Sequence, residues 1–351
     1  MVMFTDRWHP QDSFFYCLQD HKGKSLLTTI DRLLESVQED IEHVEQLLLS
    51  SINSDIALIG DICKHILSSG GKRLRPLIVL LTARFCGYAG DKHIPLACAL
   101  EYIHTATLLH DDVIDHAEMR RGSSSAHTLW GNQATILAGD FFLSRAFSMA
   151  VEARDLRILD VIARTSTCLA EAETYQVAKA GDPLISEAEY FFIIKNKTAG
   201  LIAAAARIGG MLGGIPAQQE QALEAYGLNL GIAFQIMDDV LDYYSSEKEF
   251  GKTIGKDLQE GSITLPFIAA LSKSSSPDRD LMMDIIQRRN HGKEELALIV
   301  SLIEKYNGSA YAFDKARYYA QQAQEALIIF DGSENKNGLL ELAEYVVDRK
   351  F

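Results

Sequence analysis

The stretch His104–Gly122, HTATLLHDDVIDHAEMRRG, carries three aspartates behind an apolar lead-in and two arginines after them. Asp111, Asp112 and Asp115 stand at positions i, i+1 and i+4. Residues three and four apart share one face of a helix, so the carboxylates would gather at its C-terminal end, where the helix dipole is negative. A divalent metal ion would relieve their repulsion, with Asp111 and Asp115 as direct ligands and Asp112 in a supporting role. A solvated acidic helix end is the simpler alternative.

A second copy of this pattern favours the metal site. The segment FQIMDDVLD places Asp238, Asp239 and Asp242 behind another apolar lead-in at the same spacing, and Gln235 falls on the same predicted face. Mg²⁺ binds oxygen ligands, keeps several waters and is usually held by one or two carboxylates together with substrate phosphates. Two such faces therefore predict a site for Mg²⁺ and a diphosphate.

The composition is that of an acidic, core-forming protein. The chain has 351 residues, of which 47% are hydrophobic, and a net charge of −14. It can build a large core, but it offers no basic face for nucleic acid. Its five cysteines show no metal-binding spacing, which predicts free thiols. The N-terminus lacks a signal-peptide pattern and the longest small-apolar run, 200–214, is too short to span a bilayer, so we expect a cytoplasmic protein without a transmembrane segment.

Helical periodicity dominates from residue 26 onward. It predicts one all-α domain over 26–351, preceded by an N-terminal appendage, 1–25, without that periodicity. No segment has the pattern of a strand, and no linker rich in Ser, Gly or Pro divides the chain. The predicted helices, about a dozen, cover residues 26–51, 55–69, 76–88, 92–118, 131–150, 154–180, 186–212, 217–245, 264–273, 278–289, 293–305, 308–328 and 336–348.

Three groups of cationic residues accompany the aspartates. The loop GGKRLRP holds Lys72 and Arg75 before a predicted helix, where backbone N–H groups and cationic side chains together favour an anion. Arg120 and Arg121 can bind a diphosphate bidentately or pair with the aspartates beside them. Lys197, followed by a threonine, lies in an otherwise apolar predicted helix. A solvated loop and a lysine that reaches the surface are the simpler alternatives for the first and third groups.

Taken together, these segments resemble the trans-polyprenyl diphosphate synthases. GGKRLRP, EYIHTATLLHDDVIDHAEMRRG, KNKTAG, FQIMDDVLDY and GKTIGKDLQEGSITLP stand in that family's order and cover the chain from residue ~50 to its end. The resemblance implies the all-α isoprenoid synthase fold, a homodimer, and a site in a deep cavity between the two aspartate helices. It implies isopentenyl diphosphate and an allylic diphosphate as substrates, and about three Mg²⁺ ions in each active site.

The resemblance also implies roles for individual residues. The residues on which catalysis depends would be Asp111, Asp115, Asp238 and Lys197. The metal-binding set would be Asp111, Asp112, Asp115, Asp238, Asp239 and Asp242. The set for the diphosphate of isopentenyl diphosphate would be Lys72, Arg75, His104 and Arg121. The set for the allylic diphosphate would be Arg120, Lys197, Thr198, Gln235 and Lys252.

The reaction implied is a head-to-tail condensation. The allylic C–O bond would ionise while metal ions and cationic side chains stabilise the departing diphosphate. The double bond of isopentenyl diphosphate would attack the carbocation, a proton would pass to diphosphate, and apolar walls would exclude water. The chain departs from the family pattern at Ser262, where lysine often follows Glu-Gly, and at the three serines after RRG, where Lys-Pro-Thr is more usual. The first departure would weaken diphosphate binding at the second aspartate cluster, and neither removes a metal ligand.

Small residues precede the first aspartate cluster. Helical side chains lean toward the N-terminus, so a growing chain would run from the aspartates along Thr107 and Ala106. Short-chain members of the family carry bulky aromatics just before the motif. The small residues here resemble medium- and long-chain synthases and predict a product of heptaprenyl to decaprenyl length. The candidates for the end of the tunnel are Tyr102, Phe141, Phe142 and Phe147.

Other functions fit part of the pattern. A farnesyl or geranylgeranyl diphosphate synthase would share every motif and differ in product length. A class I terpene cyclase would share the first aspartate cluster, but it would not need Lys72, Arg75 and His104. A non-catalytic subunit of a heteromeric synthase would usually lack the aspartates, whereas all six are present here. A metal-storage or signalling bundle would leave the cation groups unexplained.

Overall fold

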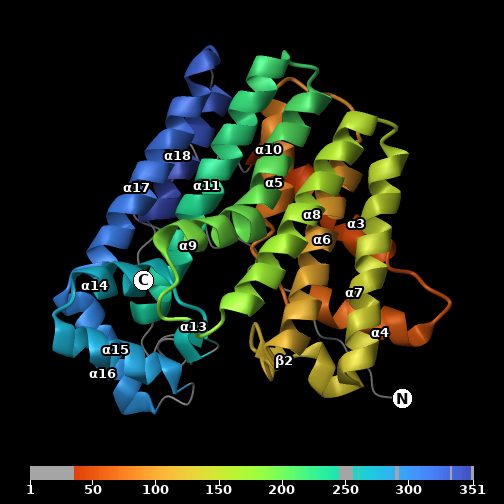
Figure 1. Ribbon diagram of the computed structural model, residues 1–351. Coiled ribbons are helices and arrows are strands. Elements are labelled where there is room, and N and C mark those ends of the chain that lie inside the picture. The colour runs from red at the N-terminus through yellow and green to blue at the C-terminus, as the bar shows by residue number, and fades with distance from the viewer. Residues whose placement is uncertain (1–34, 245–255, 260, 289–291, 333, 349–351) are drawn as a thin grey trace. The chain divides into compact units, whose positions relative to one another are not determined.

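The computed structural model of the chain describes residues 35–244, 256–259, 261–288, 292–332 and 334–348 and is helical almost throughout them (Figure 1). This confirms the all-α prediction. The α-helices are α3 (Gln38–Ser50), α4 (Ala57–Ser68), α5 (Leu74–Phe85), α6 (His93–Ile114), α7 (Ala126–Glu152), α8 (Leu156–Lys179), α9 (Glu187–Ile194), α10 (Gly200–Leu212), α11 (Ala217–Tyr244), α13 (Lys256–Gln259), α14 (Leu265–Lys273), α15 (Ser276–Gln287), α16 (Lys293–Lys305), α17 (Gly308–Ala326) and α18 (Glu334–Asp348). The remaining elements are strands β1 (Met119–Arg120) and β2 (Ser123–Ser124), the π-helical turn η2 (Lys195–Ala199) and the 3₁₀ turn η3 (Leu327–Ile329).

The chain divides into two compact units. Unit 1 comprises Met1–Ala163, Ala204–Gln221 and Gly332–Glu341, and unit 2 comprises Arg164–Ala203, Ala222–Asp331 and Leu342–Phe351. Helices α8, α10, α11 and α18 contribute residues to both units. The single domain over 26–351 stays a prediction, and the appendage at 1–25 lies outside the described residues.

Helix α6, which carries the first aspartate cluster, forms the centre of unit 1. It packs along α7 and also contacts α5 and α3. Four consecutive residues, Ala97, Cys98, Ala99 and Leu100, point to all sides of the helix, and all four are completely buried. A helix that is apolar all round is a core helix. The first aspartate cluster therefore begins where a rigid core helix reaches its C-terminal end.

Helix α11, which carries the second aspartate cluster, is held by an apolar cluster within unit 2. Ile232, Ile236 and Val240 lie one turn apart on one face of the helix and are buried against Tyr190 and Leu265 from α9 and α14. Helices α14, α16 and α17 pack on one another beside this cluster. The second set of carboxylates is thus also fixed on a well-packed helix.

A short hairpin follows α6, where the sequence predicted a longer helix and no strand. The helix ends at Ile114, because His116 has a left-handed backbone with φ of 51°. Strands β1 and β2 then pair antiparallel. Arg121 and Gly122, which join the strands, have φ angles of 52° and 79°, as a two-residue hairpin turn requires. The prediction was wrong here because strands of two residues are too short to show the alternation of apolar and polar residues that marks a strand in a sequence.

Two predicted helices contain an interruption. The helix predicted over 131–150 begins earlier, at Ala126, and bends at Gly131, which has non-helical angles (φ 81°, ψ 161°). The helix predicted over 186–212 is interrupted by the π-helical turn η2. Among the described residues, α7 is the one helix long and apolar enough to cross a membrane by length and composition. Its packing along α6 favours the interpretation of a core helix.

Candidate active site

The three aspartates at the end of α6 have different environments. Asp111 is half-buried and Asp115 is exposed, whereas Asp112 is completely buried. Consecutive residues of a helix point about 100° apart, so Asp112 turns into the protein while its neighbours line the outer face. Asp111 and Asp115 are therefore the two carboxylates of this cluster that are accessible to a ligand.

Arg120 of strand β1 holds the buried aspartate. Its Nε and a terminal nitrogen both donate to Oδ1 of Asp112, at 2.8 and 2.5 Å. The other oxygen, Oδ2, is buried and has no hydrogen-bond partner. The hairpin thus brings Arg120 back to the end of α6, where it pairs with an aspartate of the first cluster. Asp112 ties the hairpin to the helix and supports the two outer aspartates.

The donor set fits a metal ion that is shared with a substrate. Among the described residues, no group of three or more histidine, cysteine or acidic side chains lies close enough to hold a metal ion by itself. Asp111 and Asp115 nevertheless offer carboxylate oxygens from one helix end, where positive charge is favoured. Mg²⁺ is commonly held by such a pair together with phosphate oxygens and water. The residues therefore fit Mg²⁺ bound together with a diphosphate.

The loop before α5 depends on two glycines. Gly70 and Gly71 have φ angles of 78° and 155°, which side-chain-bearing residues rarely adopt. A Cβ atom at Gly71 would also meet the guanidinium groups of Arg73 and Arg121, at 3.1 and 2.5 Å. The Gly-Gly pair thus lets two arginines approach the loop closely. This crowding places Arg121 next to the segment that carries Lys72.

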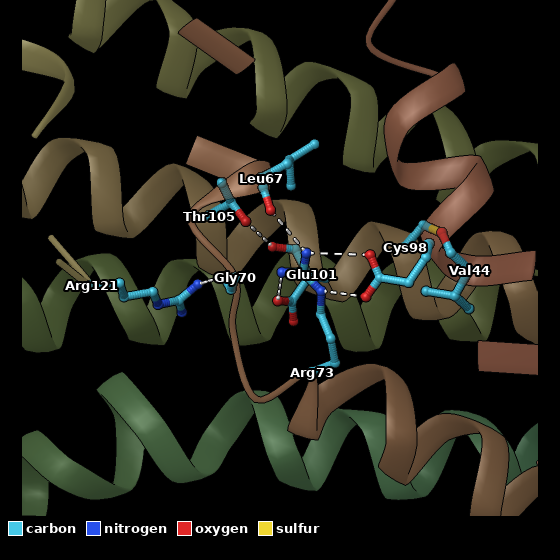
Figure 2. A network of polar contacts seen from close by, with 9 residues as sticks. Val44, Leu67, Gly70, Arg73, Cys98, Glu101, Thr105 and Arg121 are labelled. Carbon is cyan, nitrogen blue, oxygen red and sulfur yellow. Dashed lines mark hydrogen bonds and ion pairs between the residues drawn. The ribbon is translucent and has the colours of Figure 1, made fainter. Parts of the chain in front are cut away.

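Arg73, within the same loop, forms a buried ion-pair network that the sequence analysis missed (Figure 2). Its Nε and one terminal nitrogen contact Glu45 of α3 and Glu101 of α6, at 2.7 and 3.1 Å. The side chain of Arg73 is only 5% exposed. The signal that could have found this network is a single acid, Glu101, within the apolar run of α6.

Other residues of unit 1 that were predicted to bind a diphosphate interact with the same loop or with one another. A terminal nitrogen of Arg121 donates to the carbonyl oxygen of Gly70 (Figure 2). Burial, followed by the charges of four arginines with Arg75 first among them, holds the pKa of His104 well below its usual range. Burial also lowers the pKa of Arg75, and the negative charge of Glu101 partly offsets this lowering. Neutral His104 can therefore donate a hydrogen bond without adding a further charge to a cation-rich anion site.

The second aspartate cluster contains a buried chain of hydrogen bonds. Tyr190 donates to Oδ2 of Asp239 at 2.6 Å, and Gln235 donates to Oδ1 at 2.7 Å. Thr198 in turn donates to Oε1 of Gln235 at 2.8 Å. Burial raises the pKa of Asp239, its two donors lower it, and the charges of Asp238 and its neighbours raise it further. Asp239 is buried and accepts hydrogen bonds from two protein donors, as Asp112 does in the first cluster.

The π-helical turn η2 brings Thr198 to α11. A Cβ atom at Gly231 would lie 2.6 Å from the backbone of Ala199, so only glycine allows the turn and the helix to come this close. Turns of this kind, one residue wider than an α-helical turn, occur frequently at functional sites. Lys197, which the sequence placed in a regular helix, lies in this turn and is half-buried. The structure thus brings Thr198, Gln235 and Asp239 together in unit 2.

Other predicted residues of unit 2 lie nearby or outside the described chain. Oδ2 of Asp242 accepts a hydrogen bond from the backbone N–H of Asp257 at 3.1 Å. Ser262, which stands where lysine is common, accepts a hydrogen bond from Gln176 at 3.2 Å. Lys252 lies outside the described residues. Asp238 is half-buried on α11.

The two residues proposed to set product length lie one turn before the aspartates. Ala106 is completely buried, and Thr107 is half-buried and donates to the carbonyl oxygen of His104 at 2.8 Å. Tyr102 is completely buried, its ring centroid lies 5.0 Å from that of Phe142, and its hydroxyl donates to the carbonyl oxygen of Leu48 at 2.6 Å. Phe142 is also completely buried, whereas Phe141 and Phe147 are half-buried.

Comparison with known proteins identifies the family. Residues 56–303 match the family model described as polyprenyl synthetase. This chain belongs to the polyprenyl synthetase family. It is 39% identical over 328 residues to the octaprenyl diphosphate synthase of Haemophilus influenzae, an alignment that covers 93% of this chain and 99% of that protein.

Solved structures of polyprenyl synthases show the same fold. The crystal structure of a polyprenyl synthase from Caulobacter crescentus, complexed with calcium and isoprenyl diphosphate, has a TM-score of 0.87 and 39% identity, covering 91% of this chain and 98% of that one. A decaprenyl diphosphate synthase from Rhodobacter capsulatus has a TM-score of 0.86 and 36% identity, with the same coverage. The predictions of the isoprenoid synthase fold and of a prenyltransferase are confirmed.

Proposed function

We propose that this protein is a medium- to long-chain all-trans polyprenyl diphosphate synthase. It condenses isopentenyl diphosphate head-to-tail with an allylic diphosphate, most simply to a product of heptaprenyl to decaprenyl length. The observation that carries the proposal is the set of aspartate and cation clusters on rigid helices in a member of the polyprenyl synthetase family. Relatives named as octaprenyl and decaprenyl diphosphate synthases share its length and fold. They favour this function over a terpene cyclase or a non-catalytic subunit.

We propose that each of the two substrates has its own set of binding residues. In unit 1 the cations around the glycine loop bind the diphosphate of isopentenyl diphosphate, and neutral His104 adds a hydrogen bond. In unit 2 Lys197 and Thr198, with Gln235, bind the allylic diphosphate. Arginine and lysine contacts to phosphate are charge-assisted and strong. The proposed isopentenyl diphosphate set is Lys72, Arg75, His104 and Arg121, and the proposed allylic set is Arg120, Lys197, Thr198, Gln235 and Lys252.

The proposed metal set consists of the carboxylates of the two aspartate clusters. Asp111, Asp115 and Asp238 would be the direct ligands, and we propose about three Mg²⁺ ions per active site. The second aspartates, Asp112 and Asp239, would support them, because each is buried and held by protein donors; Asp242 completes the set. Bound Mg²⁺ neutralises negative charge on the diphosphate. A relative has been crystallised with calcium and isoprenyl diphosphate, which supports a divalent ion shared with substrate.

The protein residues promote the reaction by binding and by excluding water. Lys197 and Arg120 would hold the allylic diphosphate as its C–O bond breaks, so that negative charge develops next to fixed positive charge. The electron pair of the isopentenyl double bond forms the new C–C bond, and the proton lost from the adjacent carbon passes to the released diphosphate. Apolar residues before the aspartates would keep water from the carbocation.

We also propose a cytoplasmic homodimer. Helix α7 packs on α6 with one face, while Leu129, Ile136, Leu137 and Val151 are between 41% and 62% exposed on it. Exposed apolar residues on a helix suit contact with a second copy of the chain. Cys63 and Cys98 are free and buried, as is usual in a reducing compartment. Light scattering of the purified protein would test the oligomeric state.

The decisive experiment for the function is a product analysis. Purified protein would receive farnesyl diphosphate, isopentenyl diphosphate and Mg²⁺, and the dephosphorylated products would be separated by chromatography. We expect one dominant polyprenol of seven to ten isoprene units, roughly as long as the small residues before the aspartates allow. Geranylgeraniol as the end product would make the protein a short-chain synthase. A cyclic hydrocarbon, or no product, would contradict the proposal.

Substitutions in the two units should separate the two substrates. Lys72→Ala and Arg75→Ala should raise the KM for isopentenyl diphosphate about 10- to 100-fold, because each removes a charge-assisted contact of about 1.5–3 kcal/mol. Lys197→Ala should raise the KM for the allylic substrate instead. Lys64→Ala is the control, since Lys64 is an exposed lysine of α4. Equal effects of all three variants on both substrates would contradict the proposed division.

A further inference from the structure

We infer that Arg73 and Glu101 are positioning residues, which fix the glycine loop and its Lys72 and Arg75 relative to His104 on α6. The inference rests on the proposed function and deepens it. Neither residue belongs to the sets that would touch substrate. Together they set the geometry of the site for isopentenyl diphosphate.

The backbone and side chain of Arg73 show that its position is imposed by its surroundings. Its φ is 48°, in the left-handed region, which is unfavourable for a residue with a side chain. It stands directly before the first residue of α5, between Lys72 and Arg75 in the chain. Its side chain nevertheless turns inward and is 5% exposed. A residue in this backbone conformation needs strong contacts to hold it, and Figure 2 shows them.

The guanidinium of Arg73 connects three helices to the loop. It donates to Glu45 of α3 at 2.7 Å and to Glu101 of α6 at 3.1 Å. It also donates to the carbonyl oxygen of Leu67, near the end of α4, at 3.2 Å. Both carboxylates are buried, with Glu101 only 2% exposed. Each contact is charge-assisted in a place with little solvent screening, so the network restrains the loop strongly.

The network is also connected to the substrate-binding cations by charge. The second oxygen of Glu101 is buried without a hydrogen-bond partner, and so is Nε of Arg75. Glu101 is the charge that favours the cationic form of Arg75. One buried glutamate thus serves two arginines, of which one anchors the loop and the other would bind substrate. Arg121 also contacts the loop, because it donates to the carbonyl oxygen of Gly70.

The consequence for binding follows from the position of Glu101 on α6. Glu101 lies one helical turn before His104 on the same face. The contact between Arg73 and Glu101 therefore sets the distance between the loop and His104. Recognition of a diphosphate by several donors depends on such distances, and a displacement of about 1 Å can cost on the order of 100-fold in rate.

The test compares three variants with a matched control. Arg73→Met removes the network, Arg73→Lys keeps the charge without the planar fork, and Glu101→Gln keeps the volume and removes one charge. The control is Arg84→Met, because Arg84 is a second arginine of α5 that pairs with an acid of α3, Asp40, at 2.9 Å. The KM for each substrate, kcat and the melting temperature would be measured for every variant.

We expect a rise of about tenfold or more in the KM for isopentenyl diphosphate in Arg73→Met and Glu101→Gln, with the allylic KM changed less than about twofold. Arg73→Lys should lie between these variants and the wild type. Arg84→Met should lower the melting temperature and leave both KM values unchanged. This selective rise is the result that a merely structural role would not produce.

Two outcomes would overturn the inference, and a further one would overturn the proposed function. If the folded variants have an unchanged KM for isopentenyl diphosphate, the network serves stability alone. If the KM rises equally for both substrates, the network does not act specifically on the site for isopentenyl diphosphate. If Arg73→Met does not fold, Glu101→Gln decides the question, because it conserves shape and leaves Arg73 paired with Glu45. If the wild type and Arg84→Met make no polyprenyl product, the proposed function itself is wrong.

Discussion

Replacement of Asp111 by alanine should lower turnover by about three orders of magnitude, because a lost metal contact is worth several kcal/mol in the transition state and each 1.4 kcal/mol is a factor of ten. Asp238→Ala should have a similar effect from unit 2. Neither change should cost much stability, since both side chains are half-buried. Steady-state kinetics at saturating Mg²⁺, together with melting temperatures, would measure the two effects separately.

Two controls make this expectation specific. Glu118→Ala removes an exposed acid a few residues beyond the cluster, and activity should stay normal. Asp112→Ala should lower both activity and stability, because it leaves Arg120 without its partner. Arg120 is 24% exposed, so the loss of stability should be about 1–3 kcal/mol, below that of a fully buried pair.

Removal of the metal should reproduce the aspartate variants. EDTA should abolish activity in the wild type, and added Mg²⁺ should restore it, because the metal would neutralise negative charge on the departing diphosphate. A wild type that is active in chelator, or an Asp111→Ala variant with full turnover, would show that these carboxylates do not hold a catalytic metal ion.

The helices and the aspartate clusters were predictable from local sequence. In α6, the spacing of Asp111 and Asp115 depends only on helix geometry, and the structure keeps both on the outer face. The same geometry required Asp112 to turn away, and its predicted supporting role agrees with its burial. The second cluster followed the same rule, with Gln235 one turn before the aspartates.

What could not be predicted depends on long-range contacts or on single backbone angles. The inward turn of Arg73 needs a left-handed backbone and two acids, each 28 residues away along the chain, and no periodic pattern connects them. The π-helical turn at Lys195–Ala199 adds one residue to a helical turn within an apolar segment, where period-3.6 patterns are too weak to show it. Both features bear on residues proposed to bind a diphosphate.

Ala106→Phe should shorten the product to farnesyl or geranylgeranyl length. If the growing chain runs from the aspartates along Thr107 and Ala106, a phenyl ring at Ala106 blocks it about one turn beyond Asp111. Ala106 is completely buried, so the ring has no free space and should also cost about 1–3 kcal/mol of stability. Turnover for the first condensations should persist, because no proposed metal or diphosphate contact is removed. Chromatography of the dephosphorylated products would show the change.

A matched variant distinguishes obstruction of the growing prenyl chain from the loss of stability that a larger buried side chain causes. Ala97 is also completely buried on α6, and it lies nine residues earlier, on the opposite face of the helix. Ala97→Phe should therefore lower the melting temperature comparably and leave the product length unchanged. Thr107→Phe, at a half-buried position, should shorten the product with a smaller loss of stability. A long product from both Ala106→Phe and Thr107→Phe would mean that the chain grows along another path, since a ring of this size cannot share a tunnel with a prenyl chain.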